Sequence, residues 1–440
     1  MKKRIFKGIA ATILTVMMIG VSTIGSMAAT MDAQGFVDST ETTVTLKKGI
    51  VMYNTGGNEI YYPQITYNYT ITPEDVTDGT PTVADEENPQ HIGSVKDGIA
   101  AGVTLQNSSV TFANTEHNVA AAAGTEYQKD IVLSVDLTKF SGKAGIYRYR
   151  ITETDNTAAM TAAGITRPTG YNPVRYLDVY IGNQVAPATG IEVKGYVCFI
   201  ATSNADEKID GKTPANNEIL AKTAGFVESK DTNASRTGTT SVTGNADKYY
   251  TFNVSVTKNV TGNMGDKVNA FPFALNTSGV AGQPFSVTTT GADLSLANDG
   301  VVASSKKALI GTEFTVGLAH EKNVALIGLP ANTNITKVQE TNNTHDIYTA
   351  SIAFDGTEKL APTATAYNAT ANIPAAQAVS GYENVNTQTV AATGSAYTVT
   401  NDLAQVSPTG LMFRYAPYIL LIGAALFLLA AMGRRKEEVE

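Results

Sequence analysis

Short runs of alternating apolar and polar residues recur between about residue 40 and residue 402, and glycine, asparagine, aspartate and proline separate them. Alternation predicts strands with one buried face, and turn residues at close intervals predict β-sandwiches. No long amphipathic helical pattern lies between the two ends of the chain. We therefore expect an all-β protein. The clearest expected strands are Thr43–Ile50, Ile60–Ile71, Ile131–Leu137, Ile146–Thr152, Tyr176–Ile181, Ile191–Ile200, Tyr250–Val260, Phe271–Leu275, Phe314–Leu318, Ile347–Phe354 and Tyr397–Asn401.

A polar stretch divides this body in two. Residues 229–247 read SKDTNASRTGTTSVTGNAD and contain few apolar side chains, which is typical of a linker. A chain of 440 residues has room for two or three domains. We expect two tandem immunoglobulin-like β-sandwich domains, at residues 30–228 and 248–402.

The composition excludes several classes of site. With one cysteine, Cys198, the chain has neither an intramolecular disulfide nor a multi-thiolate metal site, and we expect this thiol to be packed in a strand. The net charge of −8 argues against nucleic acid as the main partner. The four histidines are scattered and form no zinc motif. We expect no metal, no cofactor and no enzymatic turnover.

The N-terminus is typical of a secretory signal peptide covering residues 1–29. A basic start precedes an apolar stretch, Ile9–Ile24, and Ser26 and Ala28 are small residues at −3 and −1 of a cleavage site. An uncleaved N-terminal anchor is the alternative. The basic residues are Lys2, Lys3, Arg4 and Lys7.

The C-terminus, residues 403–440, has a second apolar segment, Tyr415–Met432, followed by Arg434, Arg435 and Lys436. About 18 residues can just span a bilayer as a transmembrane helix, and the basic cluster stays in the cytoplasm. Just ahead of the span lie Val406, Ser407, Pro408, Thr409 and Gly410.

A Pro-Thr-Gly sequence, an apolar span and a basic tail together resemble a Gram-positive cell-wall sorting signal. That resemblance implies that a sortase cleaves between Thr409 and Gly410 and transfers the Thr carbonyl to an amine. Proline stands one position later than in the common Leu-Pro-x-Thr-Gly form, as in variants that pilus-type sortases use. An ordinary single-span anchor with a chance Pro-Thr-Gly is the alternative.

Some charged residues stand at strand positions whose side chains are expected to face the core. Lys258 shares a strand face with Val254 and Val256, and Lys48 shares one with Leu46 and Ile50. Lysine is almost never fully buried unless it is paired. Further polar residues on apolar faces are Glu153, Glu340 and Asn401.

Buried Lys, Glu and Asn side chains have a chemistry in common. Desolvation lowers the pKa of the amine and raises the pKa of the carboxyl group. A neutral amine can attack an Asn carboxamide while the carboxylic acid shuttles protons and ammonia leaves, which gives an isopeptide bond. The alternative is a lysine that reaches water from a strand end and a glutamate paired with an arginine.

Longer motifs support the covalent hypothesis. Around Lys258 the chain reads VSVTKNVTGNMGDK and then FPF, Glu340 lies in KVQET, and Asn401 closes YTVTN. In the first domain GIYRYRITE ends at Glu153. These motifs resemble Gram-positive, sortase-assembled major (backbone) pilins of the streptococcal two-domain type, whose domains each carry an isopeptide bond. The resemblance implies a Lys258–Asn401 bond promoted by Glu340, and a Lys48 bond promoted by Glu153.

The first domain departs from the family pattern. The family closes this domain with Phe-x-Asn, whereas here the strand reads Phe226-Val227-Glu228. Two partners for Lys48 therefore remain open: Asn233 through an isopeptide bond, or Glu228 through a buried ion pair.

The resemblance implies a secreted subunit of a cell-surface pilus or fimbrium that is anchored to peptidoglycan. Its partners are a pilus-type sortase, identical subunits in a head-to-tail polymer, and minor pilins or adhesins. The acceptor of the Thr409 carbonyl is expected to be Lys222, with Lys212 in reserve. The alternative function is a monomeric wall-anchored adhesin or minor pilin for cell adhesion, which binds a host or matrix ligand.

Overall fold

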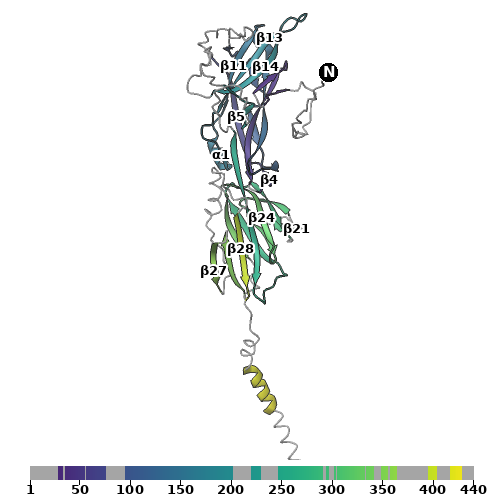
Figure 1. Cartoon of the computed structure of the whole chain (residues 1–440), viewed down its shortest axis with the longest axis vertical. Coiled ribbons are helices and arrows are strands. Elements are labelled where there is room, and N and C mark those ends of the chain that lie inside the picture. The colour runs from purple at the N-terminus through teal and green to yellow at the C-terminus, as the bar shows by residue number, and fades with distance from the viewer. Residues whose placement is uncertain are drawn as a thin grey trace, which may run out of the picture.

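The computed structural model describes an elongated, mostly β molecule (Figure 1). The first part of the chain forms the upper half of this view, and residues 252–403 form the lower half. The described residues are 28–32, 35–54, 56–75, 95–201, 220–228, 246–290, 294–296, 302–303, 305–331, 333–340, 348–354, 357–363, 395–403 and 417–428.

Two sheets pack against each other in the upper half, and their apolar faces form one core that includes Leu46, Tyr67, Ile131 and Leu177. The strands of the first layer are β1 (Ala29–Thr30), β3 (Thr43–Asn54), β7 (Val103–Leu105), β10 (Thr125–Val135) and β16 (Gly225–Phe226).

The second layer runs in the order β15-β14-β13-β11-β5-β8, and in addition β2 pairs with β14 and β6 pairs with β11. Its strands are β2 (Phe36–Asp38), β5 (Ile65–Pro73), β6 (Val95–Asp97), β8 (Ser109–Phe112), β11 (Gly145–Glu153), β13 (Val174–Asn183), β14 (Ile191–Ala201) and β15 (Leu220–Lys222). Smaller elements are β4 (Glu59–Tyr61), β9 (His117–Val119), η2 (Leu137–Phe140), α1 (Thr157–Ala162) and β12 (Ile165–Thr166).

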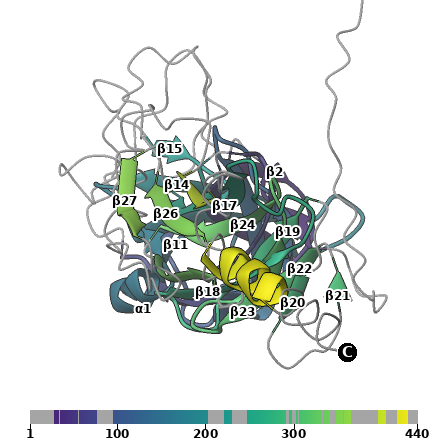
Figure 2. The same cartoon turned by 90° about the horizontal axis from the view of Figure 1, so that it is seen from below.

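The lower half also has two layers, seen end-on in Figure 2, around a separate core that includes Val256, Phe273, Val316 and Tyr397. One layer has the order β22-β19-β24-β17-β28-β26-β27: β17 (Asp247–Thr261), β19 (Pro284–Thr289), β22 (Ser305–Leu309), β24 (Asn323–Pro330), β26 (Thr349–Phe354), β27 (Thr357–Thr363) and β28 (Ser395–Asp402). The other has the order β21-β20-β23-β18-β25: β18 (Phe271–Ser278), β20 (Leu294–Leu296), β21 (Val302–Ala303), β23 (Phe314–Leu318) and β25 (Asn334–Glu340).

One strand, β17, belongs to both halves. Its first residues, Asp247–Thr251, pair in parallel with Ile50–Asn54 of β3, and its later residues pair with β28 and β24. The expected linker therefore ends in a strand that begins at Asp247, and this aspartate is fully buried. Tyr53 and Tyr250 stack at the junction with ring centroids 4.6 Å apart.

The expected all-β class is confirmed, and Phe314–Leu318 is a strand with the predicted bounds. The run Ile60–Ile71 forms two strands, β4 and β5, because residues 62–64 interrupt the pairing. Of the expected C-terminal span, the described part is an exposed helix at residues 417–428. Within the described residues, no helix is both long and apolar enough to cross a membrane.

Candidate functional site

Lys258, Glu340 and Asn401 meet in the core of the lower half, where their side chains face inward. Glu340 lies between the other two: its Oε2 is 2.9 Å from Lys258 Nζ, and Asn401 Nδ2 donates to Oε1 at 3.0 Å and to Oε2 at 3.2 Å. Lys258 and Asn401 are fully buried, and Glu340 is 9% exposed. We call these three residues the second site.

Strand register explains how the second site is assembled. β17 and β28 are parallel neighbours, and Asn401 lies opposite Val260, two residues after Lys258. The two side chains therefore project from the same sheet face. Glu340 comes from the facing sheet, where it lies opposite Phe273.

The surroundings of the amine are apolar. Lys258 Nζ lies 4.5 Å from the ring centroid of Phe271 and 5.8 Å from that of Phe273. Burial lowers the pKa of Lys258 from 10.5 to about 8, although the neighbouring Glu340 carboxylate partly opposes this change. A lowered pKa increases the neutral, nucleophilic fraction of the amine.

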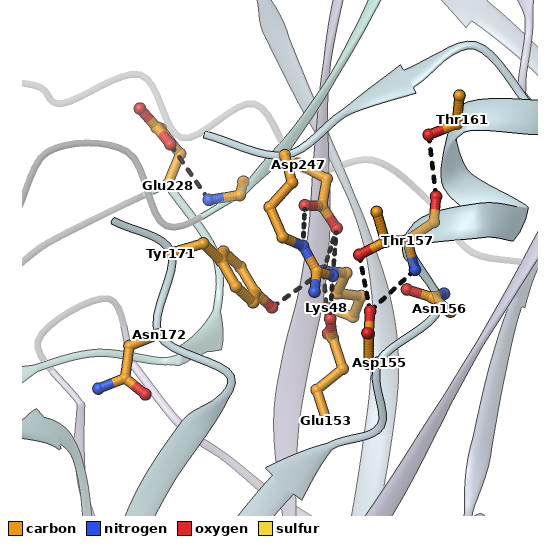
Figure 3. A network of polar contacts seen from close by, with 12 residues as sticks. Lys48, Glu153, Asp155, Asn156, Thr157, Thr161, Tyr171, Asn172, Glu228 and Asp247 are labelled. Carbon is orange, nitrogen blue, oxygen red and sulfur yellow. Dashed lines mark hydrogen bonds and ion pairs between the residues drawn. The ribbon is translucent and has the colours of Figure 1, made fainter. Parts of the chain in front are cut away.

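A related cluster, the first site, surrounds Lys48 in the upper half (Figure 3). Lys48 Nζ is 2.7 Å from Asp247 Oδ2 and 3.0 Å from Glu153 Oε2, and it donates to the hydroxyl of Tyr171 at 3.3 Å. It also lies 4.0 Å from the ring centroid of Tyr67. The side chains of Lys48, Glu153 and Asp247 are fully buried.

Arg167 adds a second cation to the first site. Its Nε donates to Asp247 Oδ1 at 3.1 Å, and its Nη2 donates to Asp247 Oδ2 at 3.3 Å and to Glu153 Oε1. The guanidinium also lies 4.1 Å from the ring centroid of Tyr171. One arginine thus binds both carboxylates that face Lys48.

These charges reverse the effect of burial on pKa. Burial alone would lower the pKa of Lys48, but Tyr171, Glu153 and Asp247 together raise it above its ordinary value. Burial alone would raise the pKa of Asp247, but Lys48 and Arg167 hold it below 3.8. Both groups are therefore ionised at neutral pH.

The residues of the two sites occupy equivalent positions in the pairing of their strands. Asp247 lies opposite Ile50, two residues after Lys48, just as Asn401 lies opposite Val260, two residues after Lys258. Glu153 lies opposite Tyr69 and Glu340 opposite Phe273, on the facing sheets. Asp247 therefore occupies in the first site the place that Asn401 occupies in the second.

This arrangement corrects one of the two expected partners of Lys48, the Glu228 ion pair. Lys48 forms its ion pairs with Asp247 and Glu153 in place of Glu228, whose carboxylate accepts a hydrogen bond from the Ala246 backbone N–H at 3.3 Å. Asn233 lies outside the described residues. The sequence placed Asp247 at the end of the expected polar linker. However, Asp247 lies two residues before Tyr249, so both side chains are expected on the same, inward face of the strand.

The remaining predicted residues lie elsewhere. Lys222 is partly exposed at the end of β15, opposite Phe199 of β14. Lys212, Val406, Ser407, Pro408, Thr409 and Gly410 lie outside the described residues. Cys198 is fully buried, and burial raises the pKa of its thiol to about 12, so it is the packed thiol that the sequence predicted.

Comparisons with known proteins identify related structures. The model of a domain of unknown function, DUF7601, matches residues 252–403. A comparison with curated proteins gives no match. Among solved structures, the chain is similar to a major pilin (T3.2) of Streptococcus pyogenes, with 18% identity, 84% of this chain and 99% of that chain covered, and a TM-score of 0.38.

Two further solved structures are a second major pilin of Streptococcus pyogenes and a pilus-presented adhesin. The pilin has 14% identity, covers 82% of this chain and 99% of its own, and has a TM-score of 0.36. The adhesin has 11% identity, covers 82% of this chain and 100% of its own, and has a TM-score of 0.21. Major pilins are thus among the structures that the chain is similar to, as the sequence resemblance predicted.

Proposed function

We propose that this chain is a structural subunit of a covalent cell-surface pilus and that its lower half is cross-linked by an isopeptide bond between Lys258 and Asn401. The observation that carries the proposal is the buried contact of Glu340 with both the amine and the carboxamide. An intramolecular cross-link of this kind suits a fibre subunit without disulfides, because such a subunit has to hold its fold under tension.

The reaction needs only these three side chains. A proton moves from Lys258 Nζ to Glu340 across the 2.9 Å contact, which leaves a neutral amine and a neutral carboxyl group. The amine nitrogen attacks Cγ of Asn401, and Glu340, which contacts Nδ2, gives its proton to that nitrogen and takes the surplus proton from Nζ. The Nζ–Cγ bond forms, the Cγ–Nδ2 bond breaks, and one ammonia leaves. Because the reaction occurs once per chain, it is not turnover.

The bond would join strands β17 and β28, which begin and end the lower half. By the loop-entropy estimate for disulfides, closing a loop of this size stabilises the folded state by roughly 4–5 kcal/mol. Tension that enters at Lys258 would leave at Asn401 without loading the strands between them. Mechanical resistance depends on the unfolding rate, so this bypass is the greater benefit.

Polymerisation needs an acceptor amine and a sorting signal. We propose that a pilus-type sortase cleaves after Thr409 and transfers its carbonyl to Lys222 of the next subunit, or finally to peptidoglycan. Lys222 is partly exposed at the end of an outer strand, β15, and this position is compatible with an acceptor. Lys212 is the reserve acceptor.

The polymer hypothesis is tested in cells that carry the matching sortase. Wild-type chain should give a ladder of covalent multimers on denaturing gels, and Lys222→Arg should abolish it. Lys139→Arg is the matched control, since Lys139 lies in the same half, in η2. A ladder that persists in Lys222→Arg would assign the acceptor to another lysine, and a single wall-linked species in the wild type would indicate the monomeric adhesin.

A further inference from the structure

The first site has the geometry of the second site but a different set of charges. We infer that Lys48 stays unbonded and that an ionised cluster, the first-site clamp, holds the strands together where the second site forms an amide bond. The clamp consists of Lys48, Glu153 and Asp247, which are labelled in Figure 3, together with Arg167. This inference goes beyond the proposed function and uses the second site only as a reference.

The electrophile is the first difference. An amide between Lys48 and Asp247 would form an Nζ–Cγ bond, break a Cγ–O bond and release water, so Asp247 would first have to be protonated. Asp247 instead accepts hydrogen bonds from Lys48 Nζ at 2.7 Å and from Arg167 Nε and Nη2 at 3.1 and 3.3 Å. Three cationic donors stabilise the carboxylate, which is a poor electrophile.

The proton shuttle is the second difference. In the second site, Glu340 can accept the proton of Lys258 because, among the described residues, it contacts that amine and the neutral Asn401. In the first site, Glu153 is bound by both Lys48 and Arg167, and an arginine keeps its proton at all accessible pH values. If Glu153 were protonated, Arg167 would face one carboxylate in place of two. Glu153 therefore cannot serve as the proton shuttle for Lys48.

Charge balance favours the ionised state. Two cations face two carboxylates, and tyrosines complete the shell: the ring of Tyr67 lies under Lys48, and Tyr69 donates to Glu153 Oε2 at 3.2 Å. Charged groups on neighbouring elements are Glu126 on β10, Arg175 on β13 and the exposed Asp155, which interacts with Arg167. A buried pair that keeps all its hydrogen bonds holds its ionised form, whereas loss of one partner is costly.

The test is a tryptic peptide map of the denatured full-length chain, because trypsin cleaves after a free lysine and not after an acylated one. We expect cleavage after Lys48 and no cleavage after Lys258. A peptide that joins Lys48 to Asp247 with the loss of one water would overturn the inference. If Lys258 is also free, the proposed isopeptide function fails while the clamp stands, so the two failures are distinguishable.

A conversion experiment tests the cause. The double variant Arg167→Leu/Asp247→Asn gives the first site the Lys, Glu and Asn set of the second site. It should form a Lys48–Asn bond with the loss of a second ammonia, and the further change Lys48→Arg should abolish that bond. If Lys48 remains free in the double variant while Lys258 is bonded, the charged groups are not what keeps the first site open.

Discussion

The two halves of the molecule place a lysine, a glutamate and a third polar residue in the same register, yet they differ in chemistry. In the lower half the third residue is Asn401, and aromatic rings surround an amine whose pKa falls to about 8. In the upper half the third residue is Asp247, and Arg167 neutralises it. The comparison teaches that strand register brings the groups together in both halves, and we propose that the charges around them decide between an amide bond and an ion pair.

Strand β17 gives this difference a mechanical meaning. It carries Asp247 at its beginning and Lys258 further on, so the two sites lie in series along one strand. Tension between the ends of the chain would pass from β3 through the clamp to β17, and then through the amide bond to β28. We therefore expect the upper half to yield first.

The largest expected effect is on extension under force. Pulling the full chain from its two ends in a single-molecule experiment should rupture the clamp and release the segment between Lys48 and Asp247. Their separation of 199 residues allows an extension of up to roughly 650–700 Å. The lower half should not extend, because the proposed amide bond would bypass it.

The control for the force experiment is Asn401→Ala, which removes the electrophile of the second site. In that variant the lower half should extend as well. An upper half that fails to extend in the wild type would contradict a non-covalent first site.

The next largest effect concerns the promoter of the second site. Glu340→Gln should leave Lys258 and Asn401 unlinked, because an amide cannot accept the proton of the lysine. The lower half should lose roughly 4–5 kcal/mol of unfolding free energy with the cross-link. Denaturant unfolding and a peptide map together check this result. Glu313→Gln is a matched control on the lower-half surface, where Glu313 pairs with Lys337, and it should leave the bond intact.

A similar but somewhat smaller effect is expected in the clamp. Asp247→Ala leaves Lys48 and Arg167 with one carboxylate between them, and breaking a buried ion pair costs about 3–5 kcal/mol. The change should destabilise the upper half and leave the Lys258–Asn401 bond in place. Amide hydrogen exchange resolved by strand would detect it, and equal loss of protection in both halves would contradict two separately held cores.

The smallest effect is the pH dependence of the upper half. Because the folded-state pKa of Asp247 is depressed, its contribution is full above its ordinary pKa of 3.8 and is lost as the pH falls through the lower folded value. Because the pKa of Lys48 is raised, its contribution is full below 10.5 and is lost as the pH rises through the higher folded value.

Hydrogen exchange at several pH values checks this pattern. The upper half should lose protection below about pH 4 before the lower half does, since an amide bond does not titrate. Loss of protection in the lower half first would contradict the assignment of the two sites.

Strand phase predicted the burial of the three second-site residues, and the family resemblance supplied their pairing. Lys258, Glu340 and Asn401 each lie on the apolar face of a strand. Because alternate side chains of a strand point to the same face, their positions in the sequence predict that they are buried. The first site was predicted only in part. Lys48 and Glu153 follow the same rule, but the third residue, Asp247, follows a polar stretch without strand character.

Arg167 could not be predicted from periodicity. It lies in the loop after β12, where no repeat relates sequence position to burial, and only the packing of that loop brings it to Asp247 and Glu153. The choice between a covalent and an ionic first site therefore depended on a residue that only the tertiary structure could locate.

The most direct test of the central claim is the mass of the denatured, purified chain, with its ends assigned by peptide sequencing. The two-site account predicts a mass lower than that of the sequence by one ammonia, with the bond mapped to Lys258 and Asn401. A mass equal to that of the sequence would contradict the isopeptide proposal, and a mass lower by an ammonia and a water would contradict the ionised clamp.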